Sequence, residues 1–302
     1  LTSATPSLES WVNCKDAKYS LIELKERFGL ANLPKIKPID LKIENLEKGQ
    51  WISNSLRFSI ESRLENKEQT LLFLNRRGYA PTTVCRLCGF QFGCNKCDAR
   101  LVNHKSRNLL ICHQCGISSQ LPTACPNCSK EGQFATIGPG IERLAEEIES
   151  IFPYARLGIL SSDNIEDKED LKKKIEQFSK GEVDIVIGTQ LVSKGYNFPN
   201  ITLVGVIDSD LALQGSDLRA SEKSFQLLRQ VSGRSGRDRK PGEALIQTYV
   251  PDHPVIAALV EGADERFLEV ETNLRKQAQA PPFGKMVAII LSGKEEKVLL
   301  DF

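Results

Sequence analysis

Two patterns of hydrophobic and polar positions alternate along most of this 302-residue chain. From residue 69 to residue 250, short apolar runs are separated by longer stretches whose apolar positions recur at helical spacing. The runs VDIVIG and ITLVGVID are almost continuously apolar, which is typical of parallel strands buried on both faces. The pattern therefore predicts a doubly wound α/β sheet. The expected strands lie at 70–75, 133–138, 155–160, 183–188, 201–208 and 243–250, and the expected helices at 141–152, 166–180 and 219–231.

Both flanks of this region are also expected to be structured. After the last strand we expect two helices, and Pro281-Pro282 stops the second because proline cannot continue a helix. A strand over 286–293 would then open a further, truncated domain. The other expected flanking elements are helices at 7–17, 52–66, 254–262 and 265–279, and strands near 19–24 and 38–43.

Composition limits the class of protein more than it identifies it. The length is enough for about two domains, and 40% of the residues are apolar. With 40 basic against 39 acidic residues the net charge is only +1, so any nucleic-acid contact must come from a local basic patch. No apolar run is long enough to span a bilayer, and no signal peptide is visible. We expect a cytoplasmic location, and a chain that is part of a longer protein because it begins at Leu1 inside LTSATP.

Eight of the nine cysteines fall between residues 85 and 128 as four Cys-x-x-Cys pairs. Disulfide scaffolds are typical of secreted proteins, and redox-active Cys-x-x-Cys normally occurs as a single pair. Structural zinc takes four thiolates in a tetrahedral arrangement, and two such pairs supply them. The spacing therefore predicts two zinc ions held by all eight thiols.

Four pairs can be combined into two sites in three ways. Sequential pairing leaves only five residues between the first two pairs, which is tight for a chain that must reverse. Nested pairing leaves fourteen residues inside the inner site and closes the insert at its base, so we favour it; the crossed pairing stays open. Nesting assigns Cys85, Cys88, Cys125 and Cys128 to one zinc ion, and Cys94, Cys97, Cys112 and Cys115 to the other.

The insert is also locally basic. Between residues 85 and 130 six basic side chains oppose one aspartate, although eight thiolates and two Zn²⁺ would bring the local charge close to neutral. Two interpretations stay open: the basic side chains face one way and contact phosphate, or they form the solvated rim of a zinc ribbon. They are Arg86, Lys96, Arg100, Lys105, Arg107 and Lys130.

Distinctive segments stand where function collects in parallel α/β sheets, at the carboxyl ends of strands. GTQLVSKGYNFP occupies 188–199, and QVSGRSGR occupies 230–237 at the end of an expected helix. Gln230, Arg234 and Arg237 are spaced i, i+4, i+7, so they share one face if the helix continues. Two guanidiniums and an amide on one face fit the oxygens of a polyphosphate, although a solvated basic face at a helix end has the same pattern.

The order of four segments resolves this ambiguity. SATP (3–6), FLNRRGY (73–79), GTQLVSKGYNFP and QVSGRSGR resemble motifs III to VI of superfamily-two helicases. The eight-cysteine insert directly after FLNRRGY narrows the resemblance to the replication-restart helicases. This resemblance extends from LTSATP to the Pro-Pro-Phe at 281–283.

The resemblance implies an ATP-dependent 3′-to-5′ DNA helicase with a RecA-like second motor lobe, two zinc ions in the nested arrangement, and ATP with Mg²⁺ as substrate. Its implied partners are forked and single-stranded DNA, the single-stranded DNA-binding protein, the primosome proteins and the loader of the replicative helicase. Arg237 would be the arginine finger, with Arg234 as a second γ-phosphate contact and Gln230 beside them. Nucleotide and DNA would be coupled through Ser3, Ala4, Thr5, Thr189, Gln190, Lys194 and Gly195, and the DNA backbone would lie near Asn75, Arg76 and Arg77. Asp208 and Asp210 fit either a family-like acidic segment or ordinary loop caps.

One departure from the family pattern bears on whether this chain alone could hydrolyse ATP. It contains no G-x-x-x-x-G-K-[ST] loop and no apolar strand ending in an Asp-Glu box, so we expect it to hydrolyse no ATP by itself. Two other functions compete: another superfamily-two translocase, and a non-catalytic zinc-ribbon scaffold. The expected division is lobe one and its connection over 1–66, lobe two over 67–84 and 130–250, the zinc insert over 85–129, and linker helices with a truncated α+β domain over 251–302.

Overall fold

The computed structural model describes most of the chain, and every structural statement below concerns those residues. They are residues 2–24, 33–44, 46–47, 49–75, 82–96, 101–104, 109–112, 115–132, 134–137, 141–161, 164–193, 196, 198–213, 218–236 and 240–287. Among their helices none is both long and apolar enough to cross a membrane.

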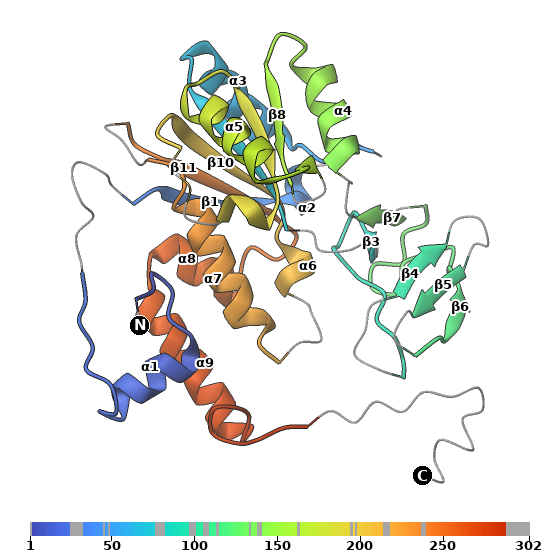
Figure 1. Ribbon diagram of the computed structural model, residues 1–302. Coiled ribbons are helices and arrows are strands. Elements are labelled where there is room, and N and C mark those ends of the chain that lie inside the picture. The colour runs from blue at the N-terminus through green and yellow to red at the C-terminus, as the bar shows by residue number, and fades with distance from the viewer. Residues whose placement is uncertain are drawn as a thin grey trace.

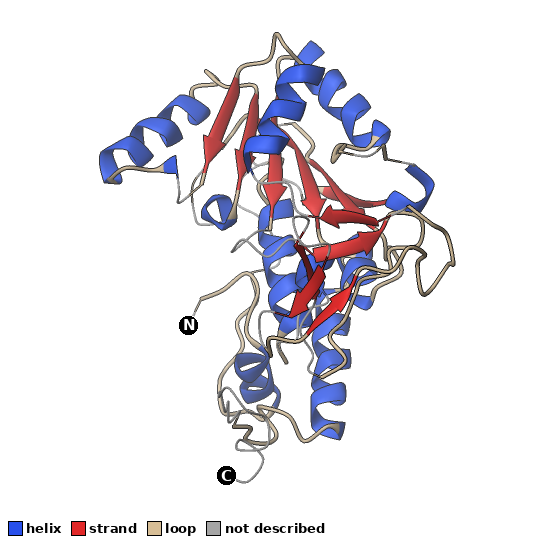
Figure 2. Cartoon of the chain, turned by 90° about the vertical axis from the view of Figure 1, so that its right-hand side faces the viewer, coloured by secondary structure: helices blue, strands red, loops and turns tan. Residues whose placement is uncertain are grey.

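A six-stranded, wholly parallel sheet forms the centre of the larger domain (Figures 1 and 2). Its central strands are buried at every position, because helices cover both faces. The predicted doubly wound α/β fold is confirmed. In spatial order the strands are β1 (Lys35–Asp40), β11 (Glu243–Thr248), β10 (Ile201–Asp208), β2 (Gln69–Leu74), β9 (Ile185–Gly188) and β8 (Leu157–Leu160).

Alternate side chains of each strand enter two separate cores, as the two-residue period of a strand requires. On β2, Leu71 and Phe73 join one core, whereas Leu72 and Leu74 join the other. The first core is closed by α1 (Leu8–Lys15), α5 (Lys168–Ser179), α7 (Ala220–Ser232), α8 (Pro254–Glu261) and α9 (Asp264–Gln277). The second is closed by α2 (Leu41–Glu44), α3 (Asn54–Glu65) and α4 (Ile141–Ile151).

The cysteine-rich insert has its own five-stranded antiparallel sheet, which Figure 1 shows beside the larger domain. We expected the strand over 133–138 to belong to the six-stranded sheet, and that prediction is wrong. The segment forms β7 and pairs with β3 along four residue pairs, so it closes the insert. The insert sheet, in spatial order, contains β6 (Ser118–Gln120), β5 (Leu109–Cys112), β4 (Leu101–His104), β3 (Thr82–Cys85) and β7 (Phe134–Ile137).

Two expectations for the N-terminal flank also change. The strand expected at 38–43 is β1, which begins earlier, pairs with β11 and so belongs to the large sheet. It ends at Asp40, whose carboxylate accepts the amide of Lys42 at 2.9 Å and starts α2. The expected strand at 19–24 is not formed, and Ile22 and Leu24 are 84% and 91% exposed. A strand needs a sheet edge to pair with, and this segment has none among the described residues.

A buried ionic cluster joins the helices below the sheet. Arg275 on α9 bonds Glu222 on α7 at 2.9 Å and Glu271 on its own helix at 3.0 Å. Arg275 and Glu222 are each 3% exposed, so neither charge has water as an alternative partner. Removing one member of such a pair costs roughly 3–5 kcal/mol, because it strands the other charge. The cluster therefore fixes α7 relative to α9.

Candidate metal centres and motor motifs

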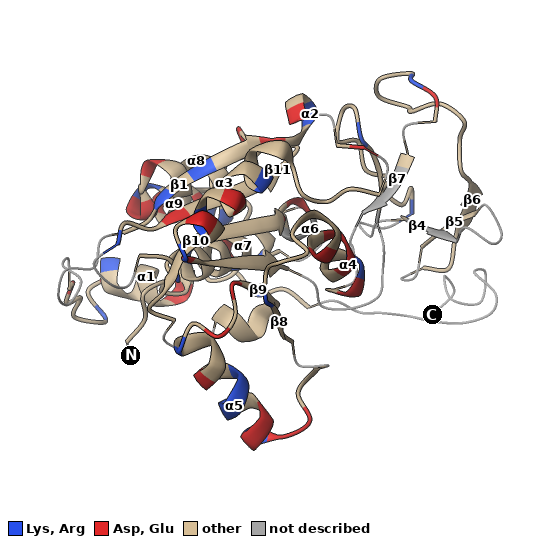
Figure 3. Cartoon of the chain, turned by 90° about the horizontal axis from the view of Figure 1, so that it is seen from above, with Lys and Arg blue, Asp and Glu red and all other residues tan. Residues whose placement is uncertain are grey.

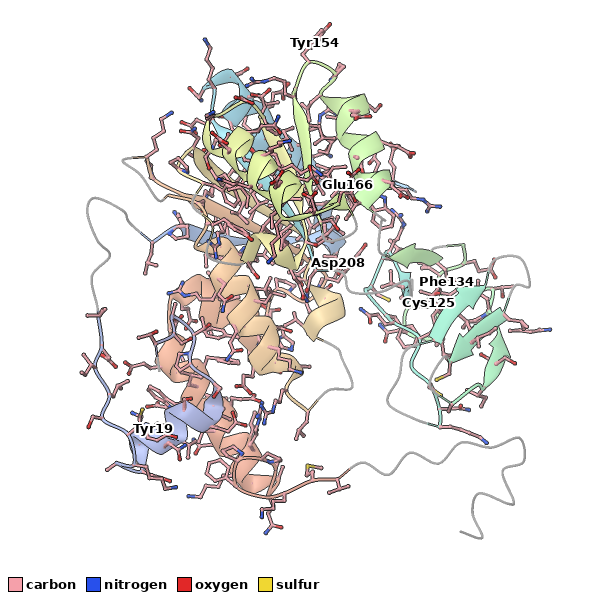
Figure 4. The ribbon with its side chains drawn as sticks, viewed as in Figure 1. Tyr19, Cys125, Phe134, Tyr154, Glu166 and Asp208 are labelled. Atoms are coloured by element: carbon pink, nitrogen blue, oxygen red, sulfur yellow. The ribbon has the colours of Figure 1, made fainter. Side chains whose placement is uncertain are left out.

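The insert brings together the thiols that nested pairing combines. The Sγ atoms of Cys85, Cys88, Cys125 and Cys128 all lie within 4.8 Å of one another. Cys85 and Cys128 are 3.6 Å apart, and Cys88 and Cys125 are 3.7 Å apart. We call this group the outer cluster. It lies at the base of the insert, and Figure 4 labels Cys125 within it.

A second group, the inner cluster, contains Cys94, Cys112 and Cys115, whose Sγ atoms also lie within 4.8 Å. Cys94 and Cys115 are 3.4 Å apart. Cys97, the fourth predicted ligand, lies outside the described residues. The sequential and crossed pairings would separate Cys94 from the Cys112/Cys115 pair, so neither fits this arrangement.

Both clusters fit zinc rather than disulfides. A disulfide places its sulfurs about 2.05 Å apart, far less than any of the separations above. Four thiolates around zinc, with Zn–S bonds of about 2.3 Å, sit about 3.8 Å apart, which is close to the observed spacing.

The pKa values of two thiols in the outer cluster differ strongly from each other. Burial raises the pKa of the Cys85 thiol to about 12. At Cys88 burial also acts to raise the pKa, but hydrogen bonds from Asn127 and the Phe90 amide outweigh it and lower the value to about 7. Four thiolates this close together would repel one another, and a Zn²⁺ ion held among them would supply the compensating charge.

Tight turns set the thiols at the required spacing. In three of the Cys-x-x-Cys turns the amide of the residue after the second cysteine donates to the carbonyl of the first: Gly89 to Cys85, Gly116 to Cys112, and Ser129 to Cys125. The three residues have φ of +75°, +78° and +57°, a conformation that glycine adopts most easily.

The SATP-like segment is bound along one face of α7. Gln230 donates to the hydroxyl of Thr5 at 2.9 Å, and Gln226 donates to the carbonyl of Pro6 at 3.0 Å. Glu222 accepts the amide of Leu8 at 2.8 Å, and Arg219 pairs with Glu9. These bonds are made by the N-cap Arg219 and three residues of α7, spaced by three or four positions, so they form one stripe of the helix.

Sequence reasoning identified Thr5 and Gln230 but missed the rest of this stripe. The polar spacing of Arg219, Glu222 and Gln226 was visible in the sequence. However, nothing there indicated that the partner would be the N-terminal segment rather than solvent.

The QVSGRSGR segment differs from expectation because α7 ends at Ser232. Gly233 and Gly236 disfavour continuation of the helix, and the chain closes in tight turns. Gln230 and Arg234 therefore do not share a helix face: Gln230 is exposed, whereas Arg234 is 5% exposed. Arg237 lies outside the described residues.

Arg234 contacts the loop that resembles motif V. Its guanidinium donates to the carbonyl oxygen of Tyr196 at 2.7 Å and to that of Ser193. Thr189 begins this loop, and its amide donates to Leu160 at the end of β8. Gln190 follows in a short 3-10 helix, Gln190–Ser193. Lys194 and Gly195 lie outside the described residues.

The remaining predicted positions are exposed, half-buried or outside the described residues. Ser3 and Ala4 are exposed, and the Ser3 hydroxyl accepts the amide of Thr5 at 3.1 Å. Asn75 follows β2 directly and is half-buried. Arg76 and Arg77 lie outside the described residues.

Asp210 acts as a loop cap. Its carboxylate accepts the amide of Tyr249 at 2.7 Å and the hydroxyls of Thr248 and Ser209. Burial raises its pKa above the ordinary range for aspartate, against these hydrogen bonds. Asp208 is the last residue of β10, at the carboxyl end of that strand, and Figure 4 labels it.

Two family models match the chain. Residues 94–119 match the PriA DNA helicase Cys-rich region domain, and residues 130–239 match the helicase conserved C-terminal domain.

Curated relatives match along nearly the whole chain. Replication restart protein PriA of Rickettsia prowazekii is 45% identical over 100% of this chain and 46% of its own length. Replication restart protein PriA of Bacillus subtilis is 37% identical over 98% of this chain and 37% of its own length. The chain thus spans less than half the length of these relatives.

Similar solved structures include more distant helicases. Saccharomyces cerevisiae Dbp5 bound to RNA and ADP BeF3 is 13% identical with a TM-score of 0.43, over 91% of this chain and 53% of that one. The DUF1998 helicase MrfA bound to DNA and AMPPNP is 10% identical with a TM-score of 0.36, over 78% of this chain and 22% of that one.

The curated relatives and the two family models confirm the resemblance to replication-restart helicases that the motifs and the cysteine insert indicate. The chain belongs to the PriA family of replication restart proteins.

Proposed function

We propose that this chain supplies the second motor lobe and the zinc insert of an ATP-dependent 3′-to-5′ DNA helicase that restarts stalled replication forks. One observation carries the proposal: three motif-like segments distant in sequence are bonded together. Gln230 of the motif VI-like segment bonds Thr5 of the SATP segment, and Arg234 of the same motif bonds the motif V-like loop. A motor must transmit changes at nucleotide to its DNA-binding loops, and a bonded set of this kind supports that role.

In this proposal Arg237 neutralises charge on the γ-phosphoryl group, and Gln230 lies beside it. Arg234, given its bonds to the motif V-like loop, holds that loop while the nucleotide is bound. Thr189, Gln190, Lys194 and Gly195 relay the change toward DNA, and Asn75, Arg76 and Arg77 lie along the backbone of the strand. ATP and Mg²⁺ are the substrate.

The insert has a structural role in this proposal. The outer and inner clusters each hold one zinc ion, which fixes the fold of the insert and carries no step of ATP hydrolysis. Its exposed surface is suited to contact forked DNA or the partner proteins. The proposed partners are forked and single-stranded DNA, the single-stranded DNA-binding protein, the primosome proteins and the loader of the replicative helicase, in the cytoplasm.

The 302-residue chain alone should hydrolyse no ATP, because its sequence has no loop that cradles the β- and γ-phosphates. The full-length protein should hydrolyse ATP, faster with forked DNA. A coupled phosphate-release assay on both proteins, each with and without DNA, measures this. DNA-stimulated turnover by the 302-residue chain would show that it carries a complete nucleotide site. Absence of turnover in the full-length protein would remove the motor assignment.

A further inference from the structure

The chain that leaves the motor sheet for the insert touches a loop that lies earlier in the sequence. Arg86, directly after the first outer cysteine, donates from Nη1 to the carbonyl of Leu46 at 3.2 Å and to that of Glu47. Arg86 also lines a cavity of about 30 Å³ together with Trp51, Asp208 and Tyr249. The outer cluster is therefore joined to the large domain through side-chain contacts as well as through the chain itself.

Gly89 makes the closest contact at this junction. A Cβ atom at Gly89 would stand 2.7 Å from the Cβ of Tyr249, a distance that side chains do not adopt. Tyr249 is 6% exposed, and Asp210 holds its amide at 2.7 Å. Neither side can retreat easily, so this position is closed to any residue larger than glycine.

The insert offers an internal comparison for this contact. Gly116 follows the second cysteine of another Cys-x-x-Cys turn, with φ of +78° against +75° at Gly89. A Cβ atom at Gly116 would meet nothing within 4 Å. The two glycines therefore share the backbone requirement of the turn, and only Gly89 has a neighbour pressed against it.

The chain that returns from the insert holds the same loop. On α4, the Glu147 carboxylate accepts the amides of Trp51, at 2.9 and 3.0 Å, and Ile52, at 3.1 Å. From β11, Gln247 donates to the carbonyl of Trp51 at 2.7 Å and accepts the amide of Ser53 at 2.8 Å. The loop is thus held by the outgoing turn, the returning helix and the carboxyl end of the sheet.

We propose that residues 85–89, the described loop residues 46–47 and 49–53, and Tyr249 form a dock that fixes the outer cluster to the carboxyl end of the six-stranded sheet. The inner cluster, which makes no contact of this kind among the described residues, is then carried at the far end of the insert. Arg86 and Gly89 are positioning residues, because they act on the orientation of the insert and not on the nucleotide. Given the proposed helicase function, the dock transmits motor movement to whatever the insert holds.

Hydrogen exchange tests the dock without reference to activity. Gly89→Ala in the full-length protein should speed exchange of the Trp51 and Tyr249 amides by about tenfold, because the added methyl group forces the turn away from Tyr249. Gly116→Ala should carry the same backbone strain and leave those two amides within about twofold of the wild type. Metal analysis must give two zinc ions for both variants, so that the comparison concerns docking and not metal loss.

Equal acceleration in both variants, or none in Gly89→Ala with its zinc retained, would overturn the dock. If Gly89→Ala loses zinc, Arg86→Ala replaces it, since it removes the bonds to Leu46 and Glu47 without adding backbone strain. Unchanged exchange at residues 46–51 in Arg86→Ala would then overturn the dock as well.

Activity assays of the same variants test the positioning role separately. Where exchange shows the dock loosened, fork unwinding should fall about tenfold while DNA-stimulated ATP hydrolysis stays within about twofold, because the nucleotide site is untouched. Equal loss of both activities would refute the positioning role. A wild-type protein with no ATP hydrolysis would instead refute the proposed function and leave the exchange result standing on its own.

Discussion

Replacing Arg237 by alanine in the full-length protein is expected to abolish DNA-stimulated ATP hydrolysis and unwinding while leaving DNA binding nearly unchanged. The γ-phosphoryl oxygens gain charge in the transition state, and an arginine aimed at them contributes on the order of 10³ to 10⁵ in rate in GTPases. We expect a loss of that order here. Arg237→Lys should not restore activity, because an ammonium group cannot reproduce the planar fork of guanidinium.

The control for this experiment lies on α7, the helix that ends before Arg237. Lys223 is an exposed basic residue of α7, so Lys223→Ala removes the same charge without touching the nucleotide and should keep near-normal turnover. Initial rates of phosphate release across a range of DNA concentrations separate catalysis from binding.

Arg234 provides the contrast that tests the assignment. Its guanidinium already donates to the carbonyls of Ser193 and Tyr196, so Arg234→Ala should disturb the motif V-like loop as well as turnover. If Arg237→Ala kept near-normal turnover while Arg234→Ala lost it, the roles of the two arginines would be reversed. If both variants kept turnover, QVSGRSGR would not be a motor motif.

Removing zinc is expected to unfold the insert and leave the large domain folded. Binding of structural zinc contributes an apparent 10 to 16 kcal/mol, roughly, to the folding of zinc-finger peptides. The apolar core of the insert is small, with Phe92, Leu101, Leu110 and Cys112 as its buried members among the described residues. Each face of the six-stranded sheet has a far larger core. We therefore expect the insert to depend on metal and the six-stranded sheet not to.

Metal analysis and hydrogen exchange check this directly. The purified chain should contain two zinc ions, and chelation should expose the amides of β3 to β7 while those of β2, β9 and β10 stay protected. Cys88→Ser should lose one zinc ion. Cys14→Ser, which changes the cysteine outside the insert, should keep both. One zinc ion or none in the unmodified chain, or an insert that stays protected after chelation, would show that the insert does not depend on two zinc ions.

The parts of the fold that local pattern determines were predictable. The strand expected at 201–208 is β10, Ile201–Asp208, and the expected helix over 219–231 is α7, Ala220–Ser232, because strongly apolar runs and amphipathic periods specify these elements without reference to the rest of the chain. The helix α5 carries acidic and basic side chains on its surface (Figure 3), yet its apolar residues Leu171, Ile175 and Phe178 recur at helical spacing in the sequence and pack against the first core.

The predictions that were wrong concern segments whose structure depends on contacts with residues distant in the sequence. The segment at 19–24 has the composition of a buried strand, yet no strand lies beside it in the described structure. The segment that forms β7 was a correct strand in the wrong sheet, because strand pairing is decided by tertiary contact. The Tyr249 ring against Gly89 belongs to the same class, since 160 residues separate two positions that meet only after folding.

The helix end at Ser232 is a milder failure with a visible cause. The i, i+4, i+7 spacing placed Gln230, Arg234 and Arg237 on one helical face. Gly233 and Gly236 carry low helix propensity, and they could have indicated that the helix stops before Arg234. Their low helix propensity predicts a turn after Ser232, and this turn lets Arg234 reach the motif V-like loop.

The strand polarity of unwinding distinguishes a 3′-to-5′ motor from other DNA-binding proteins. The full-length protein should be given partial duplexes with a single-stranded tail on either the 3′ or the 5′ side, with ATP and Mg²⁺, and then with a nucleotide that is not hydrolysed. For a 3′-to-5′ motor we expect the duplex to separate only with ATP, and only on substrates that such a motor can enter. Unwinding of the opposite polarity, or separation that does not need hydrolysis, would contradict this expectation.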